Sequence, residues 1–367
     1  MTINANDNAV VRYATVCSGI EGVTAAWEPL GGFEPVFFSE IAKFQSSFLK
    51  DRFPSVINLG DLTKIDGAKW KGKVDVLWGS TPCQAFSAAG NRTGLSDPRG
   101  ALTLSFVNLA DAIDPPFITW ENVKRVLSSA DNAYGQFLGA LAGSGRAVVS
   151  PSGSKWGDAG FVRGPRRTIA WRTFDAKFGG VPQQRRRVFV VACPTGGADP
   201  RDLLFERETV RGHPSPCGAG TTGYPATLGS GAEGPIYFNC DSRPKFSTEF
   251  AHPLKADTGS GGRGCILAND NVPRRLTPLE CERLMGFPDG WTDIPGATDA
   301  QRWSALGNSL AIPDVRWIGE RIKASVEEKL ARHHWPDLPR RRYGGRLANL
   351  NPEHFKWCPV EWERWAA

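Results

Sequence analysis

The sequence contains no stretch of about 18 consecutive apolar residues, so it offers no candidate for a membrane-spanning helix. Its start, MTINANDNAVVRYATV, lacks a basic segment followed by an apolar core, which argues against a secretory signal peptide. The eight cysteines form no CxxC pair, and no His lies near enough to them to suggest a zinc site. We therefore expect reduced thiols, no bound metal and a cytoplasmic location.

The pattern GxGxxG is also missing after the first expected strand, which argues against a dinucleotide-dependent oxidoreductase. What is present is the composition of a globular protein, with 41% hydrophobic, 10% aromatic and 22% charged residues. A length of 367 residues allows one large domain, or one large and one small domain. The net charge of +6 fits either an ordinary basic protein or one whose partner is a polyanion.

Strand and helix patterns alternate through the first 145 residues. This rhythm predicts an α/β fold, in which a parallel sheet carries helices on both faces. The expected strands lie at 13–17, 35–39, 74–78 and 117–120. One expected helix ends near residue 30, and the other three span 42–50, 100–112 and 124–142.

The pattern changes after about residue 145. Residues 151–165 resemble a loop, and two more strands are expected at 168–175 and 187–193. Residues 195–271 are rich in Gly, Pro, Ser and Thr, with short β-prone pieces such as PIYFN, which indicates a small second domain or a long insertion. Regular patterns return at 276–285 and 311–330. The expected organisation is a disordered start at 1–11, a large domain at 12–194 and 272–334, a small domain at 195–271 and a tail at 335–367.

The tail is basic and rich in Trp, and it contains the sequence RRRYGGR. Such a stretch fits two arrangements equally well. It either extends a nucleic-acid-binding surface or packs back on the large domain.

The segment GSTPCQAFSAAG at 79–90 directly follows an expected strand. Ligands bind at the carboxyl ends of the strands in a parallel α/β sheet, so Cys83 is expected at a ligand site. A cysteine there can be an activated nucleophile, although most cysteines are small buried hydrophobes. Pro82 before it and Gln-x-Phe-Ser after it make a rigid, polar setting, which favours the nucleophile.

Glu121, within Trp-Glu-Asn-Val, ends another expected strand and should lie at the same edge of the sheet as Cys83. A lone Glu at a strand end more often belongs to the N-terminus of the next helix. Beside a nucleophilic cysteine, its carboxyl group could instead donate a proton to a ring nitrogen or hold that nitrogen by a hydrogen bond.

The segment VPQQRRRV at 181–188 is the centre of the most basic part of the chain. On a strand, Gln183, Arg185 and Arg187 would project to one face. A run of charges usually marks a solvated face, but Arg beside Gln also suits contacts with phosphates and bases.

The segment CSGIEG at 17–22 joins the first expected strand to the first helix. Its small residues would let a ligand approach the backbone near a helix N-terminus, although any such turn looks similar. Glu40 ends the second expected strand, where an acid commonly binds a ribose in nucleotide-binding α/β folds.

Together, these segments resemble the DNA (cytosine-5)-methyltransferase family of bacteria and phages. The resemblance covers about residues 12–193 and 272–320, in the order of the family. It implies a Rossmann-like, S-adenosylmethionine-dependent methyltransferase sheet with a smaller, irregular, β-rich target recognition domain at 195–271. The motifs that carry it are PCQ at 82–84, ENV at 121–123, Gln-x-Arg-x-Arg at 183–187, RRLTPLECERLMGFP at 274–288 and GNS at 307–309.

The resemblance also implies roles for individual residues. Cys83 would add to C6 of a flipped cytosine, and Glu121 would contact N3 and the exocyclic amine. Arg185 would help to hold the flipped base, and Arg187 would support the site. The cofactor S-adenosylmethionine, which leaves as S-adenosylhomocysteine, would lie over Ser18, Gly19 and Ile20. Glu40 would bind its ribose, Ile41 would lie against the adenine, and Asp61, with Leu62 beside it, would accept a hydrogen bond from the adenine amine. The residues that would complete the pocket are Pro82, Leu102, Asn308 and Ser309.

The implied partner is double-stranded DNA, from which the target base must be flipped at a cost of a few kcal/mol. The resemblance further implies a monomer, with a cognate restriction endonuclease as a partner in the same system. The expected DNA-contacting residues are Gln84, Ser87, Arg99, Gln183, Arg243 and Arg263.

Two alternatives remain open. A tRNA cytosine-5 methyltransferase on the same scaffold would keep nearly every catalytic residue. The second alternative is a relative that binds nucleic acid without turnover. Such a protein would be free to lose any one of the catalytic residues, so the joint presence of Cys83, Glu121 and the Arg pair argues against it. The chain also departs from the first motif of the family, Phe-x-Gly-x-Gly, because Cys17 stands at the Phe position and Glu21 at the last Gly position.

Overall fold

A computed structural model gives the fold of the chain. The residues that it describes are 10–81, 98–129, 132–153, 155–205, 236–238, 246–247, 251, 253–254, 265–267, 273–334 and 357–360.

The largest element of the fold is a mixed sheet of nine strands. In chain order these are β1 (Val11–Val16), β2 (Phe33–Ser39), β3 (Ile57–Asn58), β4 (Val76–Gly79), β5 (Phe117–Val123), β6 (Ala159–Arg163), β7 (Arg167–Asp175), β8 (Arg186–Pro194) and β13 (Trp357–Val360). Their order across the sheet is β13-β6-β7-β8-β5-β4-β1-β2-β3. The strands from β5 to β3 are parallel, whereas β8 runs antiparallel to both β5 and β7. The first half of the chain therefore forms the parallel sheet that its pattern predicts.

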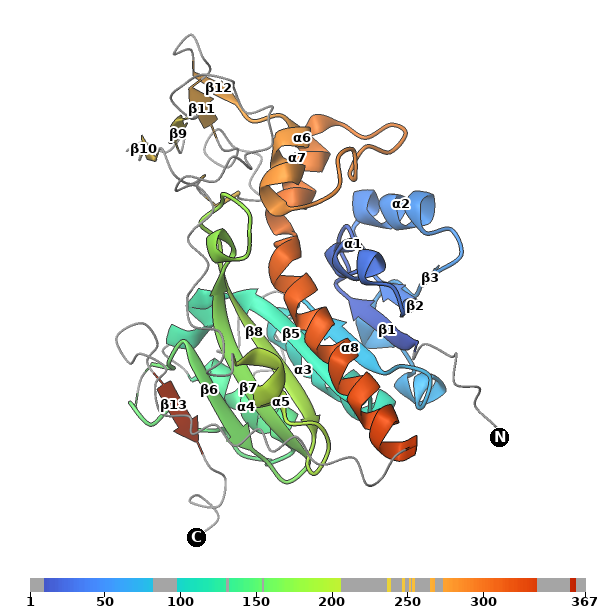
Figure 1. Ribbon diagram of the computed structural model, residues 1–367, viewed down its shortest axis with the longest axis vertical. Helices are drawn as coiled ribbons and strands as arrows, with labels where there is room; N and C mark the ends of the chain where they lie inside the picture. The colour runs from blue at the N-terminus through green and yellow to red at the C-terminus, as the bar shows by residue number, and fades with distance from the viewer. Residues whose placement is uncertain are drawn as a thin grey trace.

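Helices cover both faces of this sheet. In Figure 1, α8 crosses one face, while α3 and α4 lie behind the strands on the other face. The helices are α1 (Gly22–Trp27), α2 (Lys43–Arg52), α3 (Pro98–Ile113), α4 (Ala133–Ala142), α5 (Pro200–Leu204), α6 (Pro278–Met285), α7 (Asp299–Asn308) and α8 (Ile312–His334), with short 3-10 turns η1 (Glu28–Leu30), η2 (Leu62–Lys64), η3 (Gly67–Trp70), η4 (Lys124–Ser128) and η5 (Ala176–Phe178).

An apolar core fills the layer on each side of the sheet. Successive side chains of a strand point to opposite faces, so Trp78 of β4 packs against Trp27 of α1, whereas Leu77 packs in the cluster around Phe106 of α3. Trp27 also donates its indole N–H to the carbonyl of Val315 at 2.9 Å, which ties α1 to α8. The expected α/β fold with helices on both faces is confirmed.

A second, four-stranded sheet lies near α6 and α7 at the top of Figure 1. Its strands are β9 (Ile236–Phe238), β10 (Phe246–Ser247), β11 (Cys265–Leu267) and β12 (Pro273–Arg275), in the antiparallel order β10-β9-β11-β12. The β-prone piece PIYFN contains β9, so that strand is confirmed. The helix α5 also lies within residues 195–271, but it does not join the small sheet. It buries Leu203 and Leu204 in the same core as α8.

Two expectations about single elements are wrong. The helix expected over 124–142 is divided into η4 and α4, because Asn132 adopts a left-handed conformation (φ 51°) and donates from its side chain to the carbonyl of Val148. The segment expected as a loop at 151–165 contains β6, which is paired on both edges by β7 and β13. Pairing with distant strands, rather than a local pattern, makes β6 a strand.

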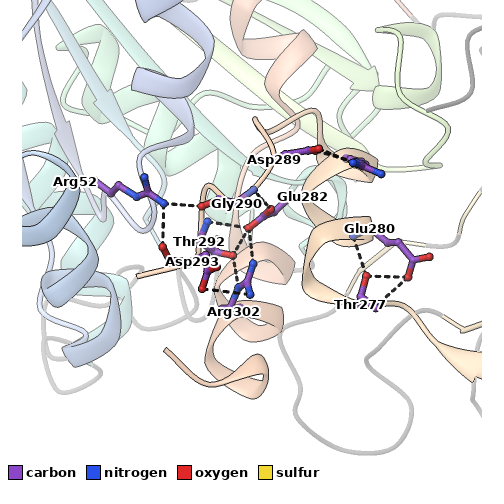
Figure 2. A network of polar contacts seen from close by, with 10 residues as sticks. Arg52, Thr277, Glu280, Glu282, Asp289, Gly290, Thr292, Asp293 and Arg302 are labelled. Carbon is purple, nitrogen blue, oxygen red and sulfur yellow. Dashed lines mark hydrogen bonds and ion pairs between the residues drawn. The ribbon is translucent and has the colours of Figure 1, made fainter. Parts of the chain in front are cut away.

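A buried carboxylate organises the loop between α6 and α7 (Figure 2). Glu282 of α6 has no exposed surface and accepts hydrogen bonds from the backbone N–H groups of Gly290 and Thr292 at 2.7 and 2.8 Å. Arg302 of α7 pairs with it at 3.2 Å. Arg52 at the end of α2 donates to the carbonyl of Gly290 at 2.6 Å. The motif that contains Glu282 thus joins α6, α7 and α2.

Part of the tail packs on the main sheet, because β13 pairs parallel with β6 at the edge of that sheet. Within the described part of the chain, no helix combines the length and apolar character that crossing a membrane requires.

Candidate active site

The carboxyl ends of β1 and β4 mark the point where the strand order of the parallel sheet reverses. From β1 the chain proceeds to β2 and β3 on one side, and then returns to β4 and β5 on the other. Crevices at such switch points are the usual ligand sites of open α/β sheets. The loop after β1 begins at Cys17 and the loop after β4 begins at Ser80, so both expected sites meet at this edge.

Two side chains of β5 hold the start of the segment that contains the expected nucleophile. The Trp120 indole N–H donates to the Thr81 hydroxyl at 2.9 Å, and the Asn122 side chain donates to the Thr81 carbonyl at 2.8 Å. Thr81 is buried and precedes Cys83 by two residues. The chain just before Cys83 is therefore held by Trp120 and Asn122, the residues on either side of Glu121.

Glu121 of β5 is buried and paired with Arg187 of β8, with 3.1 Å between Glu121 Oε1 and Arg187 Nε. Burial raises the pKa of the Glu121 carboxyl group, and the positive charges of Arg187 and Arg185 offset part of that rise. A carboxyl group with a raised pKa is suited to holding or donating a proton near neutral pH.

Arg185 is 1% exposed, and its guanidinium group lies among backbone carbonyls. Nη2 donates to the carbonyls of Gly307 at 3.0 Å and Ser309 at 2.5 Å, and Nη1 donates to the carbonyl of Leu254 at 3.2 Å. Desolvation lowers the pKa of Arg185 to about 9, and the charge of Arg187 acts in the same direction. Arg185 thus links the start of β8 to the turn before α8 and to the segment around Leu254.

The expectation that Gln183, Arg185 and Arg187 share one face of a strand is wrong for the first two, because β8 begins at Arg186. Gln183 forms an isolated bridge with Ala251 and is wholly buried. Neither polar atom of its side chain has a hydrogen-bond partner among the described residues. In this structure Gln183 exposes no surface to a DNA molecule.

The carboxylate of Glu40, which follows β2, is held by backbone N–H groups. Oε2 accepts from Gly19 at 2.9 Å, and Oε1 accepts from Ile41 at 2.8 Å and Ala42 at 2.7 Å. Since a carboxylate has about four acceptor sites, one site remains for a ligand hydroxyl.

The surroundings of Glu40 are open and partly apolar. Ile41 is 76% exposed. At Gly19 (φ +59°), a Cβ would meet no atom of the described residues within 4 Å. An acceptor for a ribose hydroxyl, an apolar surface for a base and an accessible backbone between them fit an adenosine-like group.

Two further segments reach the loop formed by residues 17–22. A Cβ atom added to Gly22 would lie 3.4 Å from the Ser309 Oγ, so the turn after α7 contacts the start of α1. The neighbouring residue Asn308 is exposed. Trp291, in the loop after α6, donates its indole N–H to the carbonyl of Ile20 at 2.8 Å. The sequence, with 13 Trp residues, gives no local signal that distinguishes Trp291 from the others.

The remaining expected cofactor residues have definite local roles. Asp61 accepts from the backbone N–H and the hydroxyl of Thr63 at 3.0 and 2.8 Å, and these bonds lower the pKa of Asp61. Leu62 is 5% exposed, and Leu102 is partly buried against the same core.

The described cysteine side chains are poor nucleophiles. Burial raises the thiol pKa of Cys17 to about 12, and it also raises the pKa values of Cys193 and Cys281. Formation of a thiolate is therefore disfavoured at all three of these cysteines. The expected site residues that lie outside the described residues are Pro82, Cys83, Gln84, Ser87, Arg243 and Arg263, and of Arg99, in α3, only the backbone is described.

A cavity of about 920 Å³ lies between α8 and the ends of β7 and β8. Asp314 in its wall is buried, which raises the pKa of that carboxyl group to about 7, with Asp175 acting in the same direction. Glu121 and Glu40 do not line this cavity, although the charge of Glu121 contributes to the raised pKa of Asp314 in its wall. Over the described side chains there is no group of three or more His, Cys, Asp or Glu residues that could hold a metal ion.

Comparison with known families gives a match to the family described as C-5 cytosine-specific DNA methylase, over residues 11–199 and 237–324. The matched ranges make up more than half of the chain and contain Glu121, Arg185 and Arg187. The chain belongs to this methylase family. The second matched range includes nearly all of the small sheet, β9 to β12, as well as α6 and α7.

Individual relatives extend this result. The chain is 35% identical to a protein of Escherichia phage P1 named DNA N-6-adenine-methyltransferase, over 86% of this chain and 61% of that protein. It thus spans less than two thirds of the length of that phage protein. It is 27% identical to the Type II methyltransferase M.SsoII of Shigella sonnei, over 88% of this chain and 82% of that enzyme.

Two solved structures have a similar fold. One is the Entamoeba histolytica methyltransferase EhMeth, with a TM-score of 0.59 and 18% identity over 86% of this chain and 99% of that one. The other is the S. pombe Dnmt2 methyltransferase, with a TM-score of 0.58 and 15% identity over 87% of this chain and 99% of that one. At this level of identity the likeness concerns the fold alone. The main sheet is a Rossmann-like methyltransferase sheet, as the resemblance implies.

Proposed function

We propose that the protein methylates C5 of cytosine in duplex DNA, with S-adenosylmethionine as the methyl donor. The observation that carries this proposal is the arrangement at the ends of β4 and β5. There, Trp120 and Asn122 hold Thr81, just before Cys83, on either side of the buried Glu121. A nucleophile and a proton-holding group at one edge suit attack on a ring carbon with assistance at a ring nitrogen.

In the proposed reaction, the Cys83 thiolate adds to C6 of the cytosine, which breaks the aromaticity of the ring and makes C5 nucleophilic. Glu121 holds a proton at N3 and so stabilises the electron-rich ring. The raised pKa of Glu121 favours the proton-bearing form that this step needs. After C5 has taken the methyl group, it loses its proton to a water molecule, and the electrons of that C–H bond form the C5–C6 double bond as the C6–S bond breaks and releases the Cys83 thiolate.

The loop at 17–22, together with Glu40 and Ile41, is the proposed cofactor site. When bound there, S-adenosylmethionine supplies the methyl group. Glu40 accepts from a ribose hydroxyl through its remaining acceptor site, and Ile41 covers one face of the adenine. Asp61 and Ser309 lie at the borders of this site.

Replacing Trp291 with Phe should weaken the binding of S-adenosylhomocysteine by about 2- to 10-fold, because the hydrogen bond to Ile20 is lost while the aromatic packing remains. Isothermal titration calorimetry measures this affinity. Trp317→Phe, in the wall of the cavity beside α8, is the matched control and should bind like wild type. If Trp291→Phe also bound S-adenosylhomocysteine with the wild-type affinity, the Trp291 contact would not support the cofactor loop.

The proposed substrate is duplex DNA, with residues 12–194 and 272–334 as the catalytic domain and 195–271 as the target recognition domain. Basic residues such as Arg99, Arg243 and Arg263, with Gln84 and Ser87, would contact the DNA and give salt-dependent binding. A restriction endonuclease of the same system, in the cytoplasm, is the proposed functional partner, because relatives are named Type II methyltransferases.

The name of the phage P1 relative favours a second candidate reaction, methylation of the adenine N6 amine. That reaction has no need of a thiol nucleophile, because the amine attacks the methyl group itself. The alignment covers 61% of the phage protein, so part of that protein has no counterpart in the match. The cysteine motif and the matched methylase family support the cytosine reaction.

The deciding experiment is methyl transfer from labelled S-adenosylmethionine to mixed-sequence duplex DNA and to bulk tRNA, followed by mass spectrometry of the nucleosides. We expect 5-methylcytosine in the DNA, with no detectable product from Cys83→Ala. Cys193→Ala removes a buried thiol of β8 and should remain active. N6-methyladenine in the DNA, or 5-methylcytosine only in tRNA, would replace the proposal with the corresponding alternative.

A further inference from the structure

Residues 17–22 have an unusual backbone, because two of the three positions with a positive φ angle are not glycine. Cys17, Gly19 and Glu21 all adopt positive φ angles of 52°, 59° and 51°. Residues with a Cβ rarely adopt this left-handed conformation, and they persist in it only where the surroundings hold them. The loop therefore needs contacts that fix Cys17 and Glu21.

The Glu21 side chain points into the protein and is 1% exposed. Its carboxylate accepts hydrogen bonds from the hydroxyls of Thr15 in β1 and Thr24 in α1, the latter at 2.7 Å. Desolvation raises the pKa of Glu21 to about 7. Hydrogen bonds to the carboxylate, mainly from the hydroxyls of Thr15 and Thr24, oppose that rise. The carboxylate thus joins the strand before the loop to the helix after it.

An ionised carboxylate only accepts hydrogen bonds, so it sets the direction of the hydroxyls around it. Because Thr15 donates to Glu21, its oxygen is left to accept from the Ser18 hydroxyl at 2.7 Å. The Ser18 oxygen in turn accepts from the backbone N–H of Ser39 in β2 at 3.0 Å. This chain of hydrogen bonds runs from Glu21 through the loop to the strand that carries Glu40.

We propose that Glu21 is a positioning residue of the cofactor site, whose buried carboxylate holds residues 17–21 so that the Gly19 N–H meets Glu40 and the loop stays open to the cofactor. This inference rests on the proposed cofactor. Glu21 is too deeply buried to touch a ligand, so it acts through Ser18 and Gly19. It replaces the glycine of the family motif with a side chain that fixes the turn instead of permitting it.

The first test is Glu21→Gln, which keeps the size of the side chain but forces an N–H₂ group on one of the two hydroxyls. We expect the affinity for S-adenosylhomocysteine, measured by calorimetry on the full chain, to fall about tenfold. The thermal unfolding midpoint should stay equal or rise, because a buried charge is removed. Thr24→Val should act in the same direction, and Glu28→Gln, exposed just after α1, is the matched control without effect.

Hydrogen exchange without ligand gives an independent measurement. The N–H groups of Ser18, Gly19 and Glu21 are all hydrogen-bonded, so a peptide that contains them should exchange faster in Glu21→Gln than in wild type. Unchanged exchange together with unchanged affinity would overturn the proposal. If wild type itself fails to bind S-adenosylhomocysteine, the proposed cofactor is wrong, and the exchange rates alone decide whether Glu21 holds the loop.

Discussion

Glu121→Gln should lower the rate of methyl transfer by about 10²- to 10³-fold, because a glutamine of the same size cannot hold a proton at the ring nitrogen. Single-turnover measurements with labelled S-adenosylmethionine and duplex DNA separate this step from product release. The cofactor affinity should remain unchanged, since Glu121 is on β5 and the cofactor loop follows β1. Glu34→Gln, exposed on β2, is the control with wild-type activity.

The pH profile gives the sharper test of Glu121. Burial raises the pKa of this carboxyl group, so its proton-bearing form persists to a higher pH than that of an exposed Glu. The wild-type rate should therefore fall on the alkaline side as pH rises through this raised pKa, and Glu121→Gln should lack that alkaline decline. A variant that keeps both the rate and the decline would contradict the role of Glu121.

Glu282→Ala should lower the free energy of unfolding by about 3–5 kcal/mol, the usual cost of removing one partner from a buried, hydrogen-bonded ion pair. The variant removes the buried carboxylate that pairs with Arg302 and accepts from the N–H groups of Gly290 and Thr292, and it leaves Arg302 only the more exposed Asp293 as an ion-pair partner (Figure 2). Urea unfolding monitored by circular dichroism measures the change.

Glu327→Ala, an exposed position on α8, is the matched control and should change the free energy of unfolding by less than about 0.5 kcal/mol. If Glu282→Ala were as mild as this control, the network around Glu282 would not stabilise the loop after α6. Because that loop carries Trp291, cofactor affinity should fall together with stability.

The strands β1, β2, β4 and β5 of the parallel half could be predicted because each is a short apolar run between clear turn signals, whereas the two-residue strand β3 was missed. The same local reasoning failed at β6, whose strand conformation depends on β7 and on β13, nearly 200 residues away in the chain. It also missed α7, although the sequence TDAQ contains a signal for its start. Thr298 and Gln301 form a capping box there, as Thr277 and Glu280 do at α6.

The sequence by itself determined which residue types lie at the carboxyl edge of the sheet. Glu40 follows β2 as the strand pattern predicts, whereas Glu121 lies within β5, which continues to Val123. The departure at Glu21 was equally visible in the sequence, but its meaning was not. Thr15 and Thr24 lie only six and three positions from Glu21, but the fold is what buries the carboxylate between them and raises its pKa.

Only the tertiary structure decided which of these groups meet and in which state of charge. Arg185, expected to hold a base, donates to the Ser309 carbonyl 124 positions away, and Trp291 reaches Ile20 across 271 positions. The pKa of Glu121 likewise depends on burial by strands from different parts of the chain. Contact partners and desolvation arise when distant segments pack together, and no local pattern encodes them.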